Sequence, residues 1–177
     1  MNKQFLICFS GLPGVGKTTI AKQLAKTIHG VFLRVDTIEN PIMDALNKND
    51  IGPLGYTIIA DLARENIELG SNVIIDCVNP LQISRQSFRS LASQLNVPFF
   101  DIEVQCQNKQ EHKRRIETRH NSSVKWSDIL NFVYEKWDSE HLILDSFEKT
   151  PEDNVAIIVD YIKQSMTDTL VKEPDND

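Results

Sequence analysis

The chain has 177 residues, 41% of them hydrophobic and 25% charged, so it can bury a core without disulfides or a structural metal. A formal net charge of −6 argues against tight non-specific binding to nucleic acid, which depends on neutralising many phosphates. No apolar run approaches the roughly 20 residues of a membrane helix, and the N-terminal apolar patch is shorter than a signal peptide requires. We therefore expect a cytoplasmic protein without membrane association, folded as one domain over residues 1–170 and followed by a disordered acidic tail at 171–177.

Strand and helix patterns alternate along the chain. Apolar runs typical of strands lie at 4–10, 31–36, 72–76, 98–106 and 142–145. Helical patterns lie at 17–29, 37–48, 56–69, 83–95, 109–120, 126–137 and 154–166. Strands separated by helices imply parallel pairing through right-handed crossovers. The expected fold class is therefore α/β, a three-layer sandwich, in which ligands bind beyond the carboxyl ends of the strands.

The stretch GLPGVGKT lies directly between the first predicted strand and the first predicted helix, and it completes the phosphate-loop pattern G-x-x-x-x-G-K-[ST]. Its glycines let backbone N–H groups turn inward around phosphate oxygens, and the positive end of the following helix strengthens their field. We expect Lys17 to bridge the β- and γ-phosphates of ATP, Thr18 to ligate Mg²⁺ and Thr19 to donate to the α-phosphate. The residues expected to bind the nucleotide here are Gly11, Leu12, Pro13, Gly14, Val15, Gly16, Lys17, Thr18 and Thr19.

Asp76 ends the third predicted strand, in the stretch NVIID. If that strand lies beside the phosphate loop, its carboxylate reaches the Mg²⁺ or the water around it, which makes Asp76 the second candidate metal ligand after Thr18. The alternative is an ordinary strand-ending aspartate that caps the next turn.

A kinase must hold an acceptor hydroxyl in line with the γ-phosphate, often with a carboxylate that orients the hydroxyl or takes its proton. Asp36, which closes the second predicted strand, is the candidate for this role, and Glu39 can share the site. The alternative is that Asp36 N-caps the helix that begins near Thr37, with Glu39 completing a capping box. The two interpretations are not exclusive.

The stretch RRIETR supplies positive charge near the end of the fifth helical pattern. Arg115 and Arg119 are four residues apart, on one face of that predicted helix. We expect them to compensate charge on the transferred phosphoryl group, with residues 115–127 forming a lid, because the stretch HNSSVK that follows is polar. The alternative is a solvated basic face paired with neighbouring glutamates.

Three polar residues follow the third predicted strand, and each has two open interpretations. Arg85 and Arg89 either contact the substrate or are charges on the surface of a helix. Asn79 either faces an acceptor pocket or forms an Asn-Pro turn.

Together with the phosphate loop, the stretches VIID, FLRVDTIE, DCVNP and EHKRRIETR resemble the small P-loop kinases of the adenylate kinase-like superfamily. More closely, the chain from Phe5 to Asp145 resembles predicted bacterial AAA family ATPases and kinases grouped with the chloramphenicol phosphotransferase-like and zeta-toxin-like proteins. The resemblance implies a five-stranded parallel sheet in the order 2-3-1-4-5, ATP and Mg²⁺ as cosubstrate and cofactor, and lid arginines that close over the nucleotide. It also implies that Arg115 lies near the adenine and Arg119 near the phosphates.

The expected function is that of an ATP-dependent kinase that phosphorylates a hydroxyl of an unidentified small molecule, with Lys17, Asp36 and Arg119 as catalytic residues. Two alternatives stay open: a polynucleotide 5′-hydroxyl kinase, and a nucleotide-binding regulatory ATPase with low turnover. Polynucleotide kinases of this superfamily tend to carry an arginine where Glu39 stands, and an acid there would repel an acceptor phosphate. Nucleic acid is therefore not an expected partner, and the chain can be a monomer or a homodimer.

Overall fold

The computed structural model describes residues 4–119 and 124–171, and its centre is a five-stranded sheet. The strands are β1 (Leu6–Ser10), β2 (Val31–Arg34), β3 (Val73–Asp76), β4 (Phe99–Gln105) and β5 (Leu142–Asp145). They pair in the order β2-β3-β1-β4-β5, and each of these pairings is parallel. The expected α/β class and the strand order implied by the resemblance are therefore confirmed.

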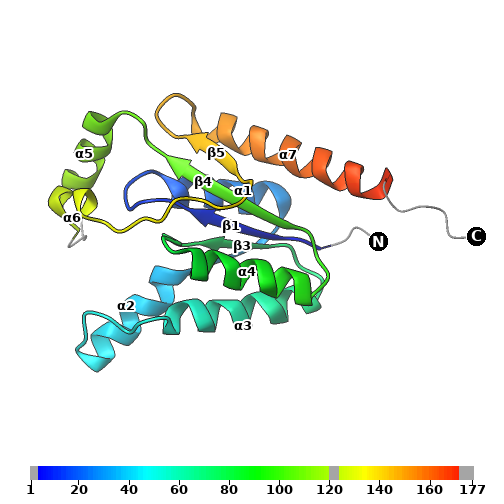
Figure 1. Ribbon diagram of the computed structural model, residues 1–177, viewed down its shortest axis with the longest axis horizontal. Coiled ribbons are helices and arrows are strands. Elements are labelled where there is room, and N and C mark those ends of the chain that lie inside the picture. The colour runs from blue at the N-terminus through cyan, green and yellow to red at the C-terminus, as the bar shows by residue number, and fades with distance from the viewer. Residues whose placement is uncertain (1–3, 120–123, 172–177) are drawn as a thin grey trace, which may run out of the picture.

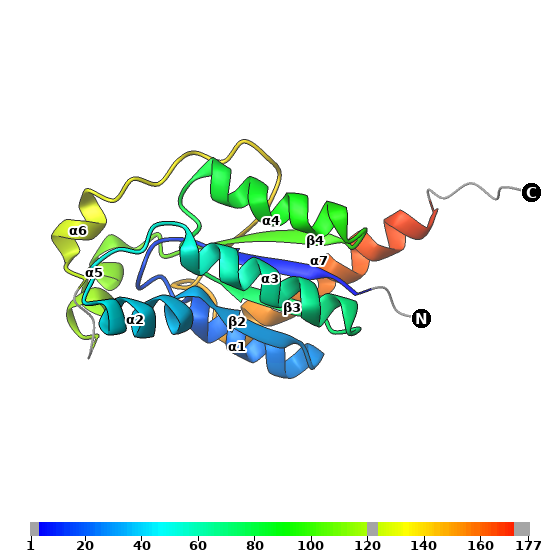
Figure 2. The same cartoon turned by 90° about the horizontal axis from the view of Figure 1, so that it is seen from below.

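Helices cover both faces of the sheet and gather at one of its ends (Figure 1). One face carries α1 (Lys17–Ile28) and α7 (Pro151–Val171), and the other carries α3 (Leu54–Glu68) and α4 (Gln82–Gln94). Figures 1 and 2 both show the remaining helices at the end where the carboxyl ends of the strands meet, namely α2 (Val35–Leu46), α5 (Lys109–Glu117) and α6 (Trp126–Leu130). Within the described residues, no helix combines the length and the apolar character needed to cross a membrane.

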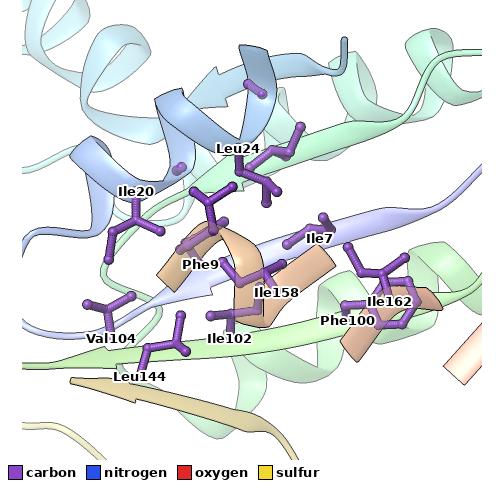
Figure 3. Packing of buried hydrophobic residues seen from close by; sticks show 14 of the residues in the cluster. Ile7, Phe9, Ile20, Leu24, Phe100, Ile102, Val104, Leu144, Ile158 and Ile162 are labelled. Carbon is purple, nitrogen blue, oxygen red and sulfur yellow. The ribbon is translucent and has the colours of Figure 1, made fainter. Parts of the chain in front are cut away.

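Side chains alternate between the two faces of the sheet along β1, whose five residues are all buried. Ile7 and Phe9 pack with α1 and α7, whereas Leu6 and Cys8 pack with α3 and α4. Figure 3 shows the first of these clusters, in which Phe9 lies among side chains of α1 and α7. A strand covered on both faces needs apolar residues at successive positions, which is why a continuous apolar run predicts it.

The second strand ends earlier than its apolar pattern indicates. β2 stops at Arg34, so Val35 and Asp36 belong to the first turn of α2. Val35 is buried in the cluster under α3 and α4, and the chain turns into the helix at this point. The N-cap is Arg34 and it makes no side-chain capping hydrogen bond, so the interpretation of Asp36 as an N-cap with Glu39 completing a capping box is wrong.

The helix predicted over 126–137 is also wrong in its extent. α6 ends at Leu130, and residues 132–138 have no regular secondary structure. The backbone finds partners outside a helix here, because the N–H of Glu135 donates to the carbonyl of Pro80, and the carbonyls of Glu135 and Lys136 accept from the Arg85 guanidinium.

Two predicted segments fall partly or wholly on residues that the structure does not describe. Of the predicted lid at 115–127, residues 120–123 lie outside the described residues. Of the predicted tail at 171–177, only Val171 is described, as the last residue of α7. The single domain over 1–170 and the disordered tail therefore stay predictions.

Gly11 sits where no side chain fits. Its φ is +135°, and a β-carbon there would lie 2.3 Å from the carbonyl oxygen of Val104 on β4. We expect Gly11→Ala to lower the free energy of unfolding by roughly 2 kcal/mol or more, through backbone strain and this clash. Gly52→Ala is the matched control, because Gly52 also has a positive φ, +59°, but no atom lies within 4 Å of the added carbon. That variant is expected to lose about 1 kcal/mol in denaturant titrations, and equal losses would contradict the clash.

Candidate active site

The sequence-predicted site residues meet at one cleft of about 740 Å³ at the carboxyl ends of the strands. Those that line it are Pro13, Gly14, Gly16, Lys17, Thr18, Thr19, Asp36, Asp76, Arg115 and Arg119. Gly11, Leu12 and Val15 do not line it, and the side chains of Leu12 and Val15 pack with the core under α1 and α7. Only the backbone of these last two residues is placed to serve a nucleotide.

The phosphate loop, residues 11–16, joins β1 to α1 and closes around the side chain of Lys17. The loop turns through positive φ at Gly11, Gly14 and Gly16, which glycine adopts without steric cost. The Lys17 ammonium donates to the carbonyl oxygens of Gly11 at 2.6 Å and Leu12 at 2.9 Å. This lysine is only 7% exposed, and its burial lowers its pKa from 10.5 to about 8, against the opposing effect of Asp76.

A second contact fixes the loop from the side of α5. Nε2 of His112 lies 2.7 Å from the carbonyl oxygen of Pro13, and the ring meets Trp126 edge-on. Gly14 packs so closely on α5 that a β-carbon there would lie 2.5 Å from Cδ1 of Ile116. α5 therefore holds the phosphate loop in its turn, which the sequence analysis missed because a lone histidine in a charged helix carries no distinguishing pattern.

The low pKa of Lys17 predicts how nucleotide binding depends on pH. We expect the affinity for Mg·ATP to be constant near pH 7 and to fall, by up to about tenfold per pH unit, above pH 8, as the uncomplexed lysine loses its charge. The contribution of Lys17 to the free energy of unfolding changes with pH in the opposite direction. Between about pH 8 and 10.5 the unfolded chain holds more protons at this lysine than the folded chain does, so this contribution rises with pH. Calorimetric titrations from pH 6.5 to 9.5 measure the first effect. Lys17→Met should bind weakly with no inflection near pH 8, and an inflection in that variant would exclude Lys17 as its source.

Thr18 and Asp76 form a pair beside the loop. The hydroxyl of Thr18 donates to Oδ2 of Asp76 at 2.6 Å. Asp76 ends β3 directly beside Phe9 of β1, and β1 leads into the phosphate loop and Thr18, so the two side chains meet. Asp76 is 3% exposed, and burial raises its pKa, while Thr18, Lys17 and Arg34 act in the other direction. Among the described residues, its side-chain contacts are with Thr18 and Arg34 and not with the turn that follows β3.

This pair has the chemistry that Mg²⁺ requires. Hydroxyl and carboxylate oxygens are hard ligands, and in phosphate-transfer sites Mg²⁺ typically takes one or two protein oxygens and completes its shell with phosphates and water. Within the part of the chain that is described, no group of three or more His, Cys, Asp or Glu side chains gathers, so no protein cage for a metal forms there. A buried carboxylate with a hydroxyl against it fits a cation that arrives with the nucleotide.

Asp36 also lines the cleft, in the first turn of α2. It pairs with the Arg34 guanidinium, which also lies 3.6 Å from Oδ2 of Asp76. Parallel pairing of β2 with β3 sets Arg34 level with Asp76, so one arginine connects the two carboxylates. Sequence analysis missed Arg34, although its position two residues before Asp36 on a strand beside β3 was a usable signal.

Glu39 lines the cleft one turn further along α2. Its side chain occupies the space beside Gly55, where a β-carbon would lie 2.3 Å from Cγ of Glu39. Burial, and then the charges of Asp36 and Asp50, raise the pKa of Glu39. No hydrogen bond or ion pair joins this carboxylate to any of the described residues.

The two predicted arginines reach the cleft from different backbone positions. Arg115, in α5, donates to the hydroxyl of Ser146 at 2.8 Å, to its carbonyl at 3.1 Å and to Glu111 at 2.8 Å. Arg119 lies beyond the end of α5, whose C-cap is Thr118, so the prediction that the two arginines share a helix face is wrong. The helix stops where the Thr118 hydroxyl turns back to the carbonyl of Arg114. The charge of Arg119 nevertheless acts on Lys17 and contributes to lowering its pKa.

Arg85 takes neither of the roles considered for it, whereas Arg89 is a partly exposed charge of α4, with a side chain 20% exposed. Arg85 is completely buried, and Arg89 forms an ion pair with Asp101 at 2.7 Å. Neither lines the cleft. Asn79 is also buried, with φ of +49°, and its side-chain amide donates to the hydroxyl of Ser10 at 3.0 Å.

The loop between β5 and α7 forms a wall of the cleft that the sequence analysis did not assign. Ser146 and Lys149 of this loop line the cleft together with Pro151 and Asn154 of the first turn of α7. This wall could have been predicted. The stretch LILD was predicted as a strand, and the carboxyl ends of parallel strands meet at one edge of a sheet, so the loop after LILD could be expected at the cleft.

A phosphate loop between β1 and α1 of a 2-3-1-4-5 sheet, with a lysine, a threonine and a strand-ending aspartate gathered beside it, defines a P-loop NTPase. Within that class, the chain belongs to the AAA domain family, whose model matches residues 6–139.

Relatives and solved structures agree with this assignment. A probable adenylyl-sulfate kinase from Aeropyrum pernix is 27% identical over 92% of this chain and 94% of its own length. Two solved structures share the fold. A gluconokinase from Sinorhizobium meliloti has a TM-score of 0.72 and 12% identity, and the match covers 98% of this chain and 99% of that one. An APS kinase from Mycobacterium tuberculosis in complex with AMPPNP and APS has a TM-score of 0.68 and 16% identity, and the match covers 91% of this chain and 98% of that one. The expected membership of the small, ATP-binding P-loop kinases is confirmed.

Proposed function

We propose that the protein transfers the γ-phosphoryl group of ATP to a hydroxyl of a small molecule that is uncharged or positively charged. One observation carries this proposal: a single cleft is lined both by Lys17 and Thr18, which directly follow the phosphate loop, and by Asp36. A carboxylate facing the phosphate loop is what a kinase needs to hold an acceptor alcohol. In an ATPase the same carboxylate would orient a water molecule, so the assay below separates transfer to an acceptor from hydrolysis.

Six side chains of the cleft have roles in this reaction. The Lys17 ammonium and the backbone N–H groups of the loop stabilise the negative charge on the phosphates, and Thr18 and Asp76 would hold a Mg²⁺ that would neutralise part of that charge. Arg119 adds positive charge near Lys17. Asp36, oriented by Arg34, holds the acceptor hydroxyl and accepts its proton as the acceptor oxygen bonds to phosphorus and the bond to the bridging oxygen of ADP breaks.

The polarity of the α2 wall supports the acceptor class. This wall, made by Arg34, Asp36, Glu39, Asn40 and Met43, carries two carboxylates against one guanidinium. That guanidinium is already shared between Asp36 and Asp76. Among the described residues no cation pairs with the carboxylate of Glu39, so an acceptor phosphate or sulfate would meet repulsion there. A hydroxyl compound that donates hydrogen bonds, or carries an ammonium group, would be stabilised.

The relatives named adenylyl-sulfate kinases favour a different acceptor, an anionic nucleotide, and a polynucleotide end is a further candidate. All three can be compared in one assay. A cell extract is separated by ion exchange into anionic, neutral and cationic pools, and these are offered with labelled ATP beside adenylyl sulfate and a 5′-hydroxyl oligonucleotide.

We expect phosphorylated products, identified by mass spectrometry, in the neutral or cationic pool, and none with Lys17→Ala. Transfer confined to adenylyl sulfate, the anionic pool or the oligonucleotide would overturn the acceptor class but keep the kinase. Binding of ATP with no transfer to any acceptor would overturn the kinase and favour a regulatory ATPase.

A further inference from the structure

Arg85, at the start of α4, is a completely buried charge with an unusual set of partners. Its guanidinium donates to four backbone carbonyls: Asn79 at 3.1 Å, Pro80 at 3.0 Å, Glu135 at 2.9 Å and Lys136 at 3.2 Å. No carboxylate forms an ion pair with it among the described residues. The cation is therefore solvated by the backbone of two segments, the loop 78–80 after β3 and the return segment 131–141, which leads from α6 to β5.

Aromatic rings complete the enclosure on the side of the return segment. The Arg85 guanidinium lies 4.9 Å from the ring centre of Tyr134 and 4.2 Å from that of Trp137. The ring of Trp137 stacks at 3.9 Å on His141, close to the start of β5. Figure 2 shows the return segment, yellow to gold, running from α6 past α4 toward β5.

A buried cation without an ion pair is costly, and an apolar side chain of similar size usually serves stability as well or better. What an apolar side chain cannot do is fix the positions of four carbonyls with one rigid planar fork. The four bonds of Arg85 therefore favour a role in fixing geometry over one in stability.

That geometry extends to the phosphate loop. The side-chain amide of Asn79 donates to the hydroxyl of Ser10, and the N–H of Gly11 donates to the carbonyl of Val78 at 3.0 Å. The carbonyl of Gly11 in turn accepts from the Lys17 ammonium at 2.6 Å. A short chain of hydrogen bonds thus joins the Arg85 guanidinium to the lysine of the proposed reaction.

We propose that Arg85 is a positioning residue: it locks the return segment onto the loop 78–80 and thereby fixes the start of the phosphate loop and the carbonyl that holds Lys17. Its effect on the transfer rate rests on the proposed function. Its effect on nucleotide hydrolysis does not.

Arg89 offers a matched control one helical turn further along α4. It bonds to the same return segment, at Ser139 and Asp138, and to Asp101 of β4, but it has no bond to the loop 78–80. Loss of its fork disturbs the return segment without touching the link to Ser10 and Gly11.

The test compares Arg85→Lys with Arg89→Lys, since lysine keeps the charge but cannot reach four carbonyls at once. Calorimetry with Mg·ATP counts the binding-competent sites, and the rate at saturating ATP is divided by that number. We expect Arg85→Lys to lower the rate per competent site about tenfold or more, because small misplacement of reacting groups is costly, and to change the affinity for ATP less than about threefold. Arg89→Lys should stay within about twofold of the wild type in both.

A purely structural role predicts a different result, namely fewer competent sites that each work at the normal rate. That result, or an equal loss in Arg89→Lys, would overturn the proposal. If Arg85→Lys does not fold, Ser10→Ala removes one of the two links to the phosphate loop, the bond from Asn79, and leaves the Val78–Gly11 bond and the carbonyls around Arg85 in place. A smaller fall in the rate per site, about threefold, is then expected, and an unchanged rate per site would overturn the proposal. If the wild type transfers to no acceptor, the proposed function fails by itself, and the rate per site is measured as ATP hydrolysis.

Discussion

Asp36→Asn is expected to lower the rate of phosphoryl transfer, at saturating ATP and acceptor, by a factor on the order of 10² to 10⁴, the usual contribution of a positioned general base. The substitution keeps the shape of the side chain and an oxygen that can accept from Arg34. What it removes is the ability to take a proton from the acceptor. The affinity for Mg·ATP should remain within about twofold, because Asp36 lies on the α2 wall and not in the phosphate loop.

The measurement is a steady-state assay with the acceptor identified by the extract screen, beside a calorimetric titration with Mg·ATP. Asp44→Asn is the matched control, since Asp44 is an exposed aspartate of the same helix and does not line the cleft. It should behave as the wild type. Full activity in Asp36→Asn would show that the carboxylate is not the base, and a parallel loss in Asp44→Asn would point to a general disturbance of α2.

The sheet was predictable because each of its strands is marked by its own apolar residues. The ends of all five strands differ from the sequence prediction by no more than two residues. Helix ends were less certain where side-chain chemistry decides them. α7 begins at Pro151 because Thr150 and Asp153 exchange hydrogen bonds, a capping-box arrangement in the stretch TPED that was readable but not used.

The return segment shows what local patterns cannot supply. WSDILNFVYEKW has a helical distribution of apolar residues, yet only Trp126–Leu130 forms a helix. The competing partners of its backbone come from Pro80 and Arg85, some fifty residues earlier in the chain. Contacts at that separation depend on the whole fold, so they override local propensity and are invisible to a window of ten residues.

The phosphate-loop side of the candidate site was predictable for the same reason as the sheet, since its motif is contiguous. Lys17, Thr18 and Asp76 lie together as the motif and the parallel topology require. The α2 wall was harder. Arg34 was not predicted as a site residue, and the strand was expected to continue through Asp36, whereas the chain turns into α2 at Val35 and one arginine pairs with carboxylates of two elements.

Arg119→Ala is the second large expected effect, a fall in the transfer rate on the order of 10³, as for arginines that neutralise charge on a transferred phosphoryl group. Arg119 lies in the turn after α5, lines the cleft and contributes to the lowered pKa of Lys17. An arginine that acts on charge developing in the transition state contributes mainly to the rate, so the loss should fall less on ATP affinity.

Arg114→Ala separates this role from the general basic character of the segment. Arg114 is an exposed arginine of the same region whose guanidinium pairs with Glu111 at 2.7 Å, and it does not line the cleft. It should keep the wild-type rate. Removing Arg119 should also raise the pKa of Lys17, because one repelling charge is gone, so the pH at which ATP affinity begins to fall should move upward from about 8. A lowered rate without that shift would place Arg119 away from the lysine, and an unchanged rate would remove it from the mechanism.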